Sequence, residues 1–392
     1  MPNSQSYTPS VSRLNDSRQV QLEVLTPLHV GAASEKLLHR GIDFFDLNDK
    51  VYIINERLLF KELVSKQVDF STYANAVSKG KADELAFYLF DQLNIDPSTV
   101  AHWVYDFSKK PDNQIRPFIR TGQGLPFIPG SSIKGAIMSA IFSGLYHNPL
   151  IGSMTGKDFL KDKTSKSIEA NRRDNRERIF DEKNYEKELL GNFHNSIGRY
   201  VRVDDCPIKN EDLDLEIVGL YNLYSEGKNW ESDWKDFSIT TELAYPSVSS
   251  EFRLNLAQPL AEIMKQSRNP VPTYLNKVFG TDSFKTLFKM INEHTKRHLD
   301  REIKFFQKYD EANGTAGILD KLKELLIQAN QVGENVCLMR MAWGSGFHAI
   351  TGDWRFSDHT STILNPDKNN RGTRYKSRKV GSDVLGFIKL SF

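Results

Sequence analysis

The first part of the chain alternates apolar and polar residues in short runs that predict strands. Residues 20–28 alternate regularly, which is typical of a strand buried on one face, and Pro27 ends the run. Residues 42–54 hold two apolar runs on either side of Asn48 and Asp49, which predicts a hairpin. This part of the chain is therefore expected to begin a sheet.

Apolar residues at helical spacing follow in two segments. Asn55 can cap a helix over 56–64, and residues 82–94 place leucine and tyrosine side chains three and four positions apart. Residues 1–16 show no such pattern and are expected to form a flexible arm.

The central part mixes strand and helix patterns with one charged segment. Residues 115–119 predict a strand, and a loop rich in glycine and proline then leads to a helix that Ser131 and Ser132 would cap. Residues 155–190 hold many charges of both signs and few apolar positions. We expect a mobile surface insertion or a solvated helix there.

The remaining patterns predict a second domain. Two strand patterns fall between residues 200 and 220, residues 274–330 are mostly helical, and an apolar run at 384–390 predicts the last strand. A turn of proline and serine separates the halves. We therefore expect an α+β protein with domains at 1–245 and 246–392.

The composition is that of a globular protein and narrows the chemistry. The 392 residues are 39% apolar and 26% charged, and 52 basic against 50 acidic side chains leave a net charge of +2. Cys206 and Cys337 stand far apart, which excludes a disulfide framework and a cysteine zinc site. No apolar run could span a membrane and the polar start predicts no signal peptide, so we expect a cytoplasmic protein.

Positive charge is nevertheless concentrated late in the sequence. Residues 366–392 hold seven basic and two acidic side chains. A nucleic-acid site needs a local patch of this kind, although a solvated tail has the same composition.

The first of three glycine motifs, F-I-P-G-S-S-I-K-G, spans 127–135. Gly130 precedes a predicted helix, and the free N–H groups and dipole of a helix start favour a phosphate. Lys134 adds a charge in the first turn, but it precedes the second glycine, so the Walker pattern of nucleotide hydrolysis is not met. An ordinary helix cap would explain the two serines but not both glycines.

The second motif, R-M-A-W-G-S-G-F-H, spans 340–348. Its two glycines allow backbone conformations that other residues avoid. Trp343 and Phe347 could stack on bases, and Arg340 could bind a phosphate. The competing interpretation is two aromatic core residues on either side of a tight turn.

The third motif, T-P-L-H-V-G at 26–31, places His29 beside a glycine turn. A histidine there can act as a general base, although a structural hydrogen-bonding role is commoner. The carboxylates show no metal-ligand spacing, since Asp204 and Asp205 would point to opposite faces of a strand. We therefore expect no metal site and no cofactor.

Taken in order, the three motifs resemble those of the RAMP superfamily of CRISPR proteins, and within it the fifth Csm subunit of type III-A effector complexes. The ending R-G-T-R-Y-K-S-R-K-V-G-S-D-V-L-G-F-I-K-L resembles the basic segment and closing strand of the same family. The similarity covers nearly the whole chain except 155–190.

The resemblance implies an α+β fold of two ferredoxin-like, RRM-type domains whose glycine-rich loops reach RNA. It implies a non-catalytic subunit that binds and caps the 3′ portion of the CRISPR RNA and supports its maturation in antiviral defence. The implied partners are the CRISPR RNA, the backbone RAMP subunits, the small helical subunit and host exonucleases.

Three positions depart from the family pattern. Gly31 is followed by two alanines rather than by serine or threonine and glycine, Met138 stands where arginine is common, and Ala342 stands where glycine is common. Each difference weakens the case for a close RNA contact at that position.

The expected RNA-binding residues come from the motifs, the predicted strand at 115–119 with the arginine that follows it, and the basic segment. They are Gly31, Arg116, Arg120, Gly130, Ser131, Ser132, Lys134, Arg340, Gly344, Ser345, Gly346, Phe347, Arg371, Arg374, Lys376, Arg378 and Lys379. Two other functions remain open. A metal-independent endoribonuclease would use His29 as its base, and a protein-interaction scaffold would expose apolar surface on 274–330.

Overall fold

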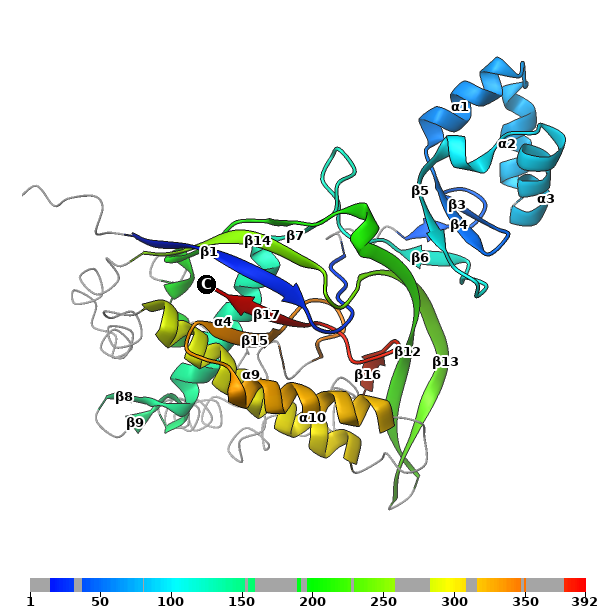
Figure 1. Cartoon of the computed structure of the whole chain (residues 1–392). Coiled ribbons are helices and arrows are strands. Elements are labelled where there is room, and N and C mark those ends of the chain that lie inside the picture. Colours follow the sequence, from blue (N-terminus) through cyan, green and yellow to red (C-terminus); the bar gives the residue numbers. More distant parts are fainter. Residues whose placement is uncertain are drawn as a thin grey trace, which may run out of the picture.

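The computed structural model describes residues 15–31, 37–79, 81–151, 154–158, 189–191, 196–226, 229–257, 283–307, 316–346, 349 and 377–392. Most of the predicted charged insertion and part of the basic segment lie outside these residues. The described chain forms a body with two five-stranded sheets and a smaller unit that projects from it (Figure 1). The predicted α+β class is confirmed.

The first sheet is antiparallel throughout and carries the main helices. Its strands, in spatial order, are β10 (Val201–Val203), β14 (Ser249–Ala257), β1 (Asn15–Val24), β17 (Phe387–Ser391) and β15 (Val336–Arg340). The helices α4 (Gly130–His147) and α9 (Ser283–Gln307) pack against it through a shared apolar core, and α10 (Ala316–Gln331) packs on α9. The prediction that residues 274–330 are mostly helical is thus confirmed over the described part of that range.

Part of this sheet has the connectivity of a ferredoxin-like unit. In chain order, β1, α4, β10, β14, α9 and β17 read β-α-β-β-α-β. In space the fourth strand lies beside the first, and the third lies between the first and the second. The unit closes when β1 pairs with β17, for example Val24 with Ile388. It therefore uses strands from both sides of 245/246, and the domain boundary there stays a prediction.

The second sheet also combines distant parts of the chain. Its strands are β16 (Ser377–Val380), β12 (Leu213–Glu226), β13 (Asn229–Ala244), β6 (Gln114–Arg116) and β2 (Leu38–His39). β12 and β13 form a long antiparallel hairpin, and β6 runs parallel to β13. This sheet brings residues near 116 and near 379 to the same part of the molecule.

The projecting unit, residues 44–106, has its own sheet and its own core (Figure 1). The sheet consists of β3 (Phe44–Leu47), β4 (Lys50–Ile54) and β5 (Ala101–Asp106). The helices are α1 (Glu56–Ser65), α2 (Phe70–Ser78), α3 (Ala82–Ala86), the π-helix η2 (Phe87–Gln92) and the 3₁₀-helix η3 (Pro97–Val100). Buried Leu59, Leu63 and Leu89 fill the space between sheet and helices.

Local signals in this unit act as predicted. Asn48 and Asp49 turn the β3–β4 hairpin with φ angles of 50° and 59°, a left-handed conformation that asparagine and aspartate tolerate. The side chain of Asn55 caps α1 by accepting from the backbone N–H groups of Arg57 and Leu58. The predicted hairpin and both predicted helices are confirmed, although the second continues as a π-helix.

Shorter elements complete the body. They are β7 (Phe127–Ile128) paired with β11 (Cys206–Pro207), β8 (Pro149–Ile151) paired with β9 (Met154–Thr155), and the 3₁₀-helices η4 (Ile197–Arg199) and η5 (Asn210–Asp212). The β7–β11 pair lies directly before α4 and holds the first glycine motif against β10.

Candidate functional site

The start of α4 is closed by a carboxylate of the protein itself. The helix begins at Gly130 with Pro129 as its cap, and no side chain of the cap residue bonds to it. The predicted capping by Ser131 and Ser132 is wrong, because both lie inside the first turn. Instead the N–H of Gly130 donates to Oδ1 of Asp205 at 2.7 Å. A side-chain carboxylate thus stands where the sequence predicted a phosphate.

Close packing explains the glycine at this position. A Cβ atom on Gly130 would lie 2.2 Å from the backbone oxygen of Val203, at the end of β10. The neighbouring Lys134 is half-buried beside Gly198, and among the described residues no carboxylate pairs with it. Lys134, rather than the helix start, is therefore the charge that this motif leaves available.

The second motif forms a tight turn after β15. Ala342, Gly344 and Gly346 have φ angles of 65°, 87° and 81°, which is the left-handed region. A Cβ on Gly344 would come within 2.6 Å of Leu385 Cδ1, whereas one on Gly346 would meet open space. The Ser345 hydroxyl donates to the backbone oxygen of Ala342 at 2.7 Å and closes the turn. The left-handed backbone at Ala342 explains why glycine suits this position.

The two motifs meet at one pocket, although they lie far apart in the sequence. The pocket has a volume of about 360 Å³ and lies between α4 and the turn after β15. Ser132 and Gly135 line it from the helix, and Ala342 and Ser345 line it from the turn. Gly135 is exposed, and a Cβ there would meet no atom within 4 Å. The pocket is therefore open to a ligand at its helical side.

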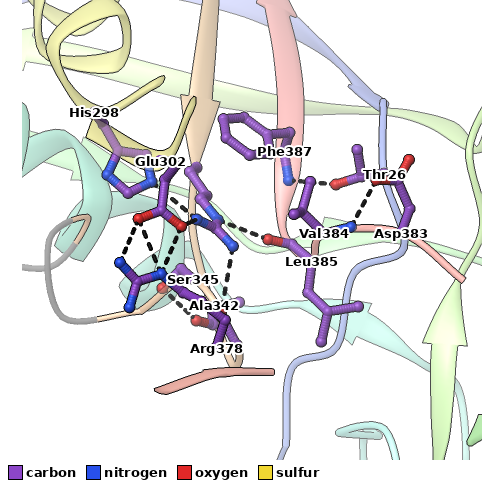
Figure 2. A network of polar contacts seen from close by, with 12 residues as sticks. Thr26, His298, Glu302, Ala342, Ser345, Arg378, Asp383, Val384, Leu385 and Phe387 are labelled. Atoms are coloured by element: carbon purple, nitrogen blue, oxygen red, sulfur yellow. Dashed lines mark hydrogen bonds and ion pairs between the residues drawn. The ribbon is translucent and has the colours of Figure 1, made fainter. Parts of the chain in front are cut away.

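A buried ion cluster supports the turn from inside (Figure 2). Glu302 on α9 is 1% exposed and pairs with Arg340 at 3.1 Å and with Arg378 at 2.8 Å. His298, one helical turn earlier, lies 2.9 Å from Nη1 of Arg340. Burial raises the pKa of Glu302, but the charges of Arg378 and Arg340 outweigh it and hold that pKa below its usual value.

This cluster removes two residues from the expected RNA contacts. The guanidinium of Arg340 also donates to the backbone oxygens of Leu385 and Gly344, at 2.8 and 3.3 Å. Arg378 lies over the ring of Phe305 at 3.9 Å. Both arginines are less than 5% exposed, so their charges hold the turn in shape and do not face solvent.

A second buried carboxylate, Glu242, binds Arg120 and so removes it from the expected RNA contacts. Glu242 on β13 is fully buried and accepts from Arg120, from Tyr105 at 2.9 Å and from Trp103 at 3.2 Å. The N–H of Phe118 donates to it at 2.7 Å. Because Trp103 and Tyr105 both belong to β5, Glu242 ties the projecting unit to the body. The charge of Arg120 is used within the fold.

His29 is buried and does not face solvent. Its ring is 0% exposed and lies between Phe118 and Trp343, with ring centroids at 5.9 and 5.3 Å. Nδ1 lies 2.8 Å from the backbone oxygen of Glu242, and burial lowers the pKa of His29 to about 4. Gly31 passes close to the ring, since a Cβ there would lie 3.0 Å from Nε2. A general base must reach its substrate, so this position does not favour the ribonuclease alternative.

Arg116 and Lys379, like Lys134, are expected contacts that pair with no carboxylate of the described residues. Both side chains are half-buried, and each charged group lies 5.0 Å from the centre of the Trp343 ring. Four other candidates lie outside the described residues: Phe347, Arg371, Arg374 and Lys376.

Three carboxylates that organise the site were missed in the sequence. Glu302 stands on the apolar stripe of α9, four residues after His298 and four before Phe306, and a charge on such a stripe is a usable signal. Glu242 stands in a strand among buried neighbours. Asp205 gave no local signal, because its partner Gly130 is distant in sequence.

The described residues form neither a metal-binding cluster nor a membrane-spanning helix. No group of three or more histidine, cysteine, aspartate or glutamate side chains in these ranges is arranged to hold a metal ion. No helix in the described part of the chain combines the length and apolarity needed to cross a membrane.

Comparison with known proteins agrees with this fold and these motifs. Residues 21–356 match the family model of the RAMP superfamily. The chain therefore belongs to the RAMP superfamily.

The relatives point to one branch of this superfamily. The CRISPR system Cms protein Csm5 of Streptococcus thermophilus is 27% identical over 143 residues, which cover 33% of this chain and 39% of that relative. A chain in a cryo-EM structure of a type III-A Csm–crRNA–target RNA ternary complex has a TM-score of 0.72 at 17% identity. That match covers 95% of this chain and 100% of the other. The crystal structure of T. onnurineus Csm5 gives a TM-score of 0.66 at 15% identity, covering 94% and 99%.

The similarity to Csm5 predicted from the three motifs is thus confirmed. At these identities the solved structures show a shared fold. The matched region of the Streptococcus relative is less than half of its length, so its role is not carried over from that match.

Proposed function

We propose that this chain is a subunit of a type III-A CRISPR effector complex and binds the 3′ portion of the CRISPR RNA without cutting it. Membership of the RAMP superfamily and the similarity to Csm5 support the assignment to such a complex. Its partners would be the backbone RAMP subunits and the small helical subunit. Trimming of the RNA would fall to a separate nuclease, such as a host exonuclease.

The observation that carries the RNA-binding proposal is the pocket shared by the two glycine motifs. It has a volume of about 360 Å³, within the range of small ligand sites, and lies between the helix α4 and the glycine turn after β15. Lys134 lies in the same turn of α4 and supplies a charge for the phosphate backbone. Single-stranded RNA fits such a site, because its unstacked bases can enter a pocket while its phosphates contact the rim.

The pocket can be filled without disturbing the fold. In Gly135→Leu the new Cβ atom meets no other atom within 4 Å, and leucine is a better helix former than glycine by roughly 0.8 kcal/mol. We expect unchanged or higher thermal stability, together with at least tenfold weaker binding of a CRISPR RNA in a fluorescence anisotropy titration. The matched control is Gly317→Leu on α10, where a Cβ also meets open space.

Other results would distinguish the RNA-binding function from the scaffold and ribonuclease alternatives. Tight RNA binding by Gly135→Leu would contradict the pocket as the RNA site. Assembly with Csm subunits without RNA binding by the isolated chain would favour the scaffold. Metal-independent cleavage of repeat RNA that His29→Ala abolishes would favour the ribonuclease.

A further inference from the structure

Three residues from distant parts of the chain form a cationic site on the body. Arg116 ends β6, Trp343 belongs to the turn after β15, and Lys379 belongs to β16. The guanidinium and the ammonium each lie 5.0 Å from the centre of the same indole ring. We call this group the Trp343 site.

The two cations of the Trp343 site have no counter-charge in the described chain. No carboxylate of the described residues lies within ion-pair distance of Arg116 or Lys379, and Nε of Arg116 is buried there without a hydrogen-bond partner. Burial lowers the pKa of Lys379, and the charge of Arg116 lowers it further. The free protein thus holds two like charges at one indole ring, each 5.0 Å from its centre, and their repulsion is relieved when an anion binds.

The site is partly open to solvent, since Arg116, Trp343 and Lys379 are each half-buried. Arg116 also lines a cleft of about 810 Å³ between β6 and α3, whereas Trp343 and Lys379 do not line it. The aromatic face holds both cationic side chains in place through cation–π contacts, so little conformational entropy is lost when an anion binds. An arginine and a lysine presented together are typical partners of a phosphate group.

We propose that Arg116 and Lys379 together hold one backbone phosphate of the bound RNA strand above the indole of Trp343. This inference rests on the proposed RNA-binding function and adds a second contact, separate from the pocket beside Gly135. A single phosphate shared by two cations accounts for both unpaired charges at once.

The test removes the charges and keeps the first two methylene groups of each side chain. The variants are Arg116→Gln, Lys379→Gln and the double variant, with Lys50→Gln plus Lys323→Gln as a control of equal charge change on exposed positions. Binding of a single-stranded CRISPR RNA is measured by fluorescence anisotropy between about 50 and 200 mM salt. Each phosphate neutralised on a single strand contributes about 0.7 to the slope of log affinity against log salt.

We expect the double variant to lose about 0.7 from this slope, which is one phosphate, and to bind roughly tenfold more weakly at 100 mM salt. The thermal stability of the free Lys379→Gln protein should be unchanged or higher, because a repulsion is removed. A loss of about 1.4 would mean two separate phosphates and would overturn the shared site.

Two further results would overturn the proposal. The first is a double variant whose slope equals that of the control while wild-type protein binds RNA, which leaves the proposed function standing. The second is a wild-type chain that binds no RNA, in which case the proposed function and the Trp343 site fail together.

Discussion

Arg378 and Lys379 are neighbours on β16, yet they belong to two different regions of the molecule. Arg378 points inward to Glu302, is 3% exposed and shares this carboxylate with Arg340 (Figure 2). Lys379 points to the other face of the strand and lies over Trp343 with Arg116 and no carboxylate among the described residues. The turn after β15 contacts both regions, because Gly344 accepts from Arg340 and Trp343 carries the aromatic ring.

The difference shows that a basic residue in this family motif can have either of two roles. A buried arginine paired with a carboxylate shapes the backbone of the turn, as Arg340 does through Gly344. A half-exposed cation without a partner is available to a ligand. The alternation of side chains along a strand decides which neighbour takes which role.

The largest effect is expected from a substitution of Glu302, the carboxylate at the centre of the buried ion cluster. Glu302→Gln leaves Arg340 and Arg378 buried without the charge that neutralises them, and removing one partner of a buried pair costs about 3–5 kcal/mol. We expect a loss of this size in the free energy of unfolding measured by urea denaturation. A loss below about 1 kcal/mol would contradict a neutralising role for Glu302.

The same carboxylate gives a pH signature with a defined sign. Because the pKa of Glu302 is lower in the folded than in the unfolded state, its contribution is present above the unfolded value of about 4.3. It is lost as the pH falls below that value toward the folded pKa. The acid loss of stability should therefore be smaller in Glu302→Gln than in the wild type.

A smaller effect should separate the two neighbours on β16. Arg378→Gln removes one of two arginines from Glu302 and is expected to cost about 1–3 kcal/mol. Lys379→Gln should change the free energy of unfolding by no more than about 0.5 kcal/mol. Both are measured by the same denaturation. Equal losses in the two variants would contradict the different roles assigned to Arg378 in the Glu302 cluster and to Lys379 at the Trp343 site.

A small effect of the opposite sign is expected at Ala342, in the turn after β15. Its φ angle of 65° is unfavourable for a residue with a Cβ, and glycine relieves this at some cost in unfolded-state entropy. Ala342→Gly should stabilise the protein by up to about 1 kcal/mol, seen as a small rise in melting temperature. Destabilisation by this change would contradict the left-handed turn.

Much of the local structure could be predicted from the pattern of residues. The β3–β4 hairpin follows from Asn48 and Asp49, and the start of α1 follows from Asn55, because these effects act within a few residues. The capping of α4 could not be predicted, because Asp205 reaches Gly130 only when β10 packs beside the helix. The projecting unit was missed as a separate body, since its core forms between segments with ordinary strand and helix patterns.

The residues of the candidate site could likewise be predicted only in part from the sequence. Lys134 and the glycines of the turn could be found as motif residues, but charge alone could not distinguish Arg116 and Lys379 from Arg120, Arg340 and Arg378. Burial in the sheet and the presence of Glu242 or Glu302 made that distinction. Neither carboxylate lies near its arginine in the sequence.

The sequence by itself determined the family, the α+β class, the order of the motifs and most helices and strands, because these depend on short-range spacing and on residues recognisable one by one. Only the tertiary structure decided that the first and last strands close one ferredoxin-like unit and that two distant motifs line one pocket. It also decided which cations of the described residues have no carboxylate partner. Pairing, burial and desolvation depend on which distant segments meet, and no local pattern specifies that.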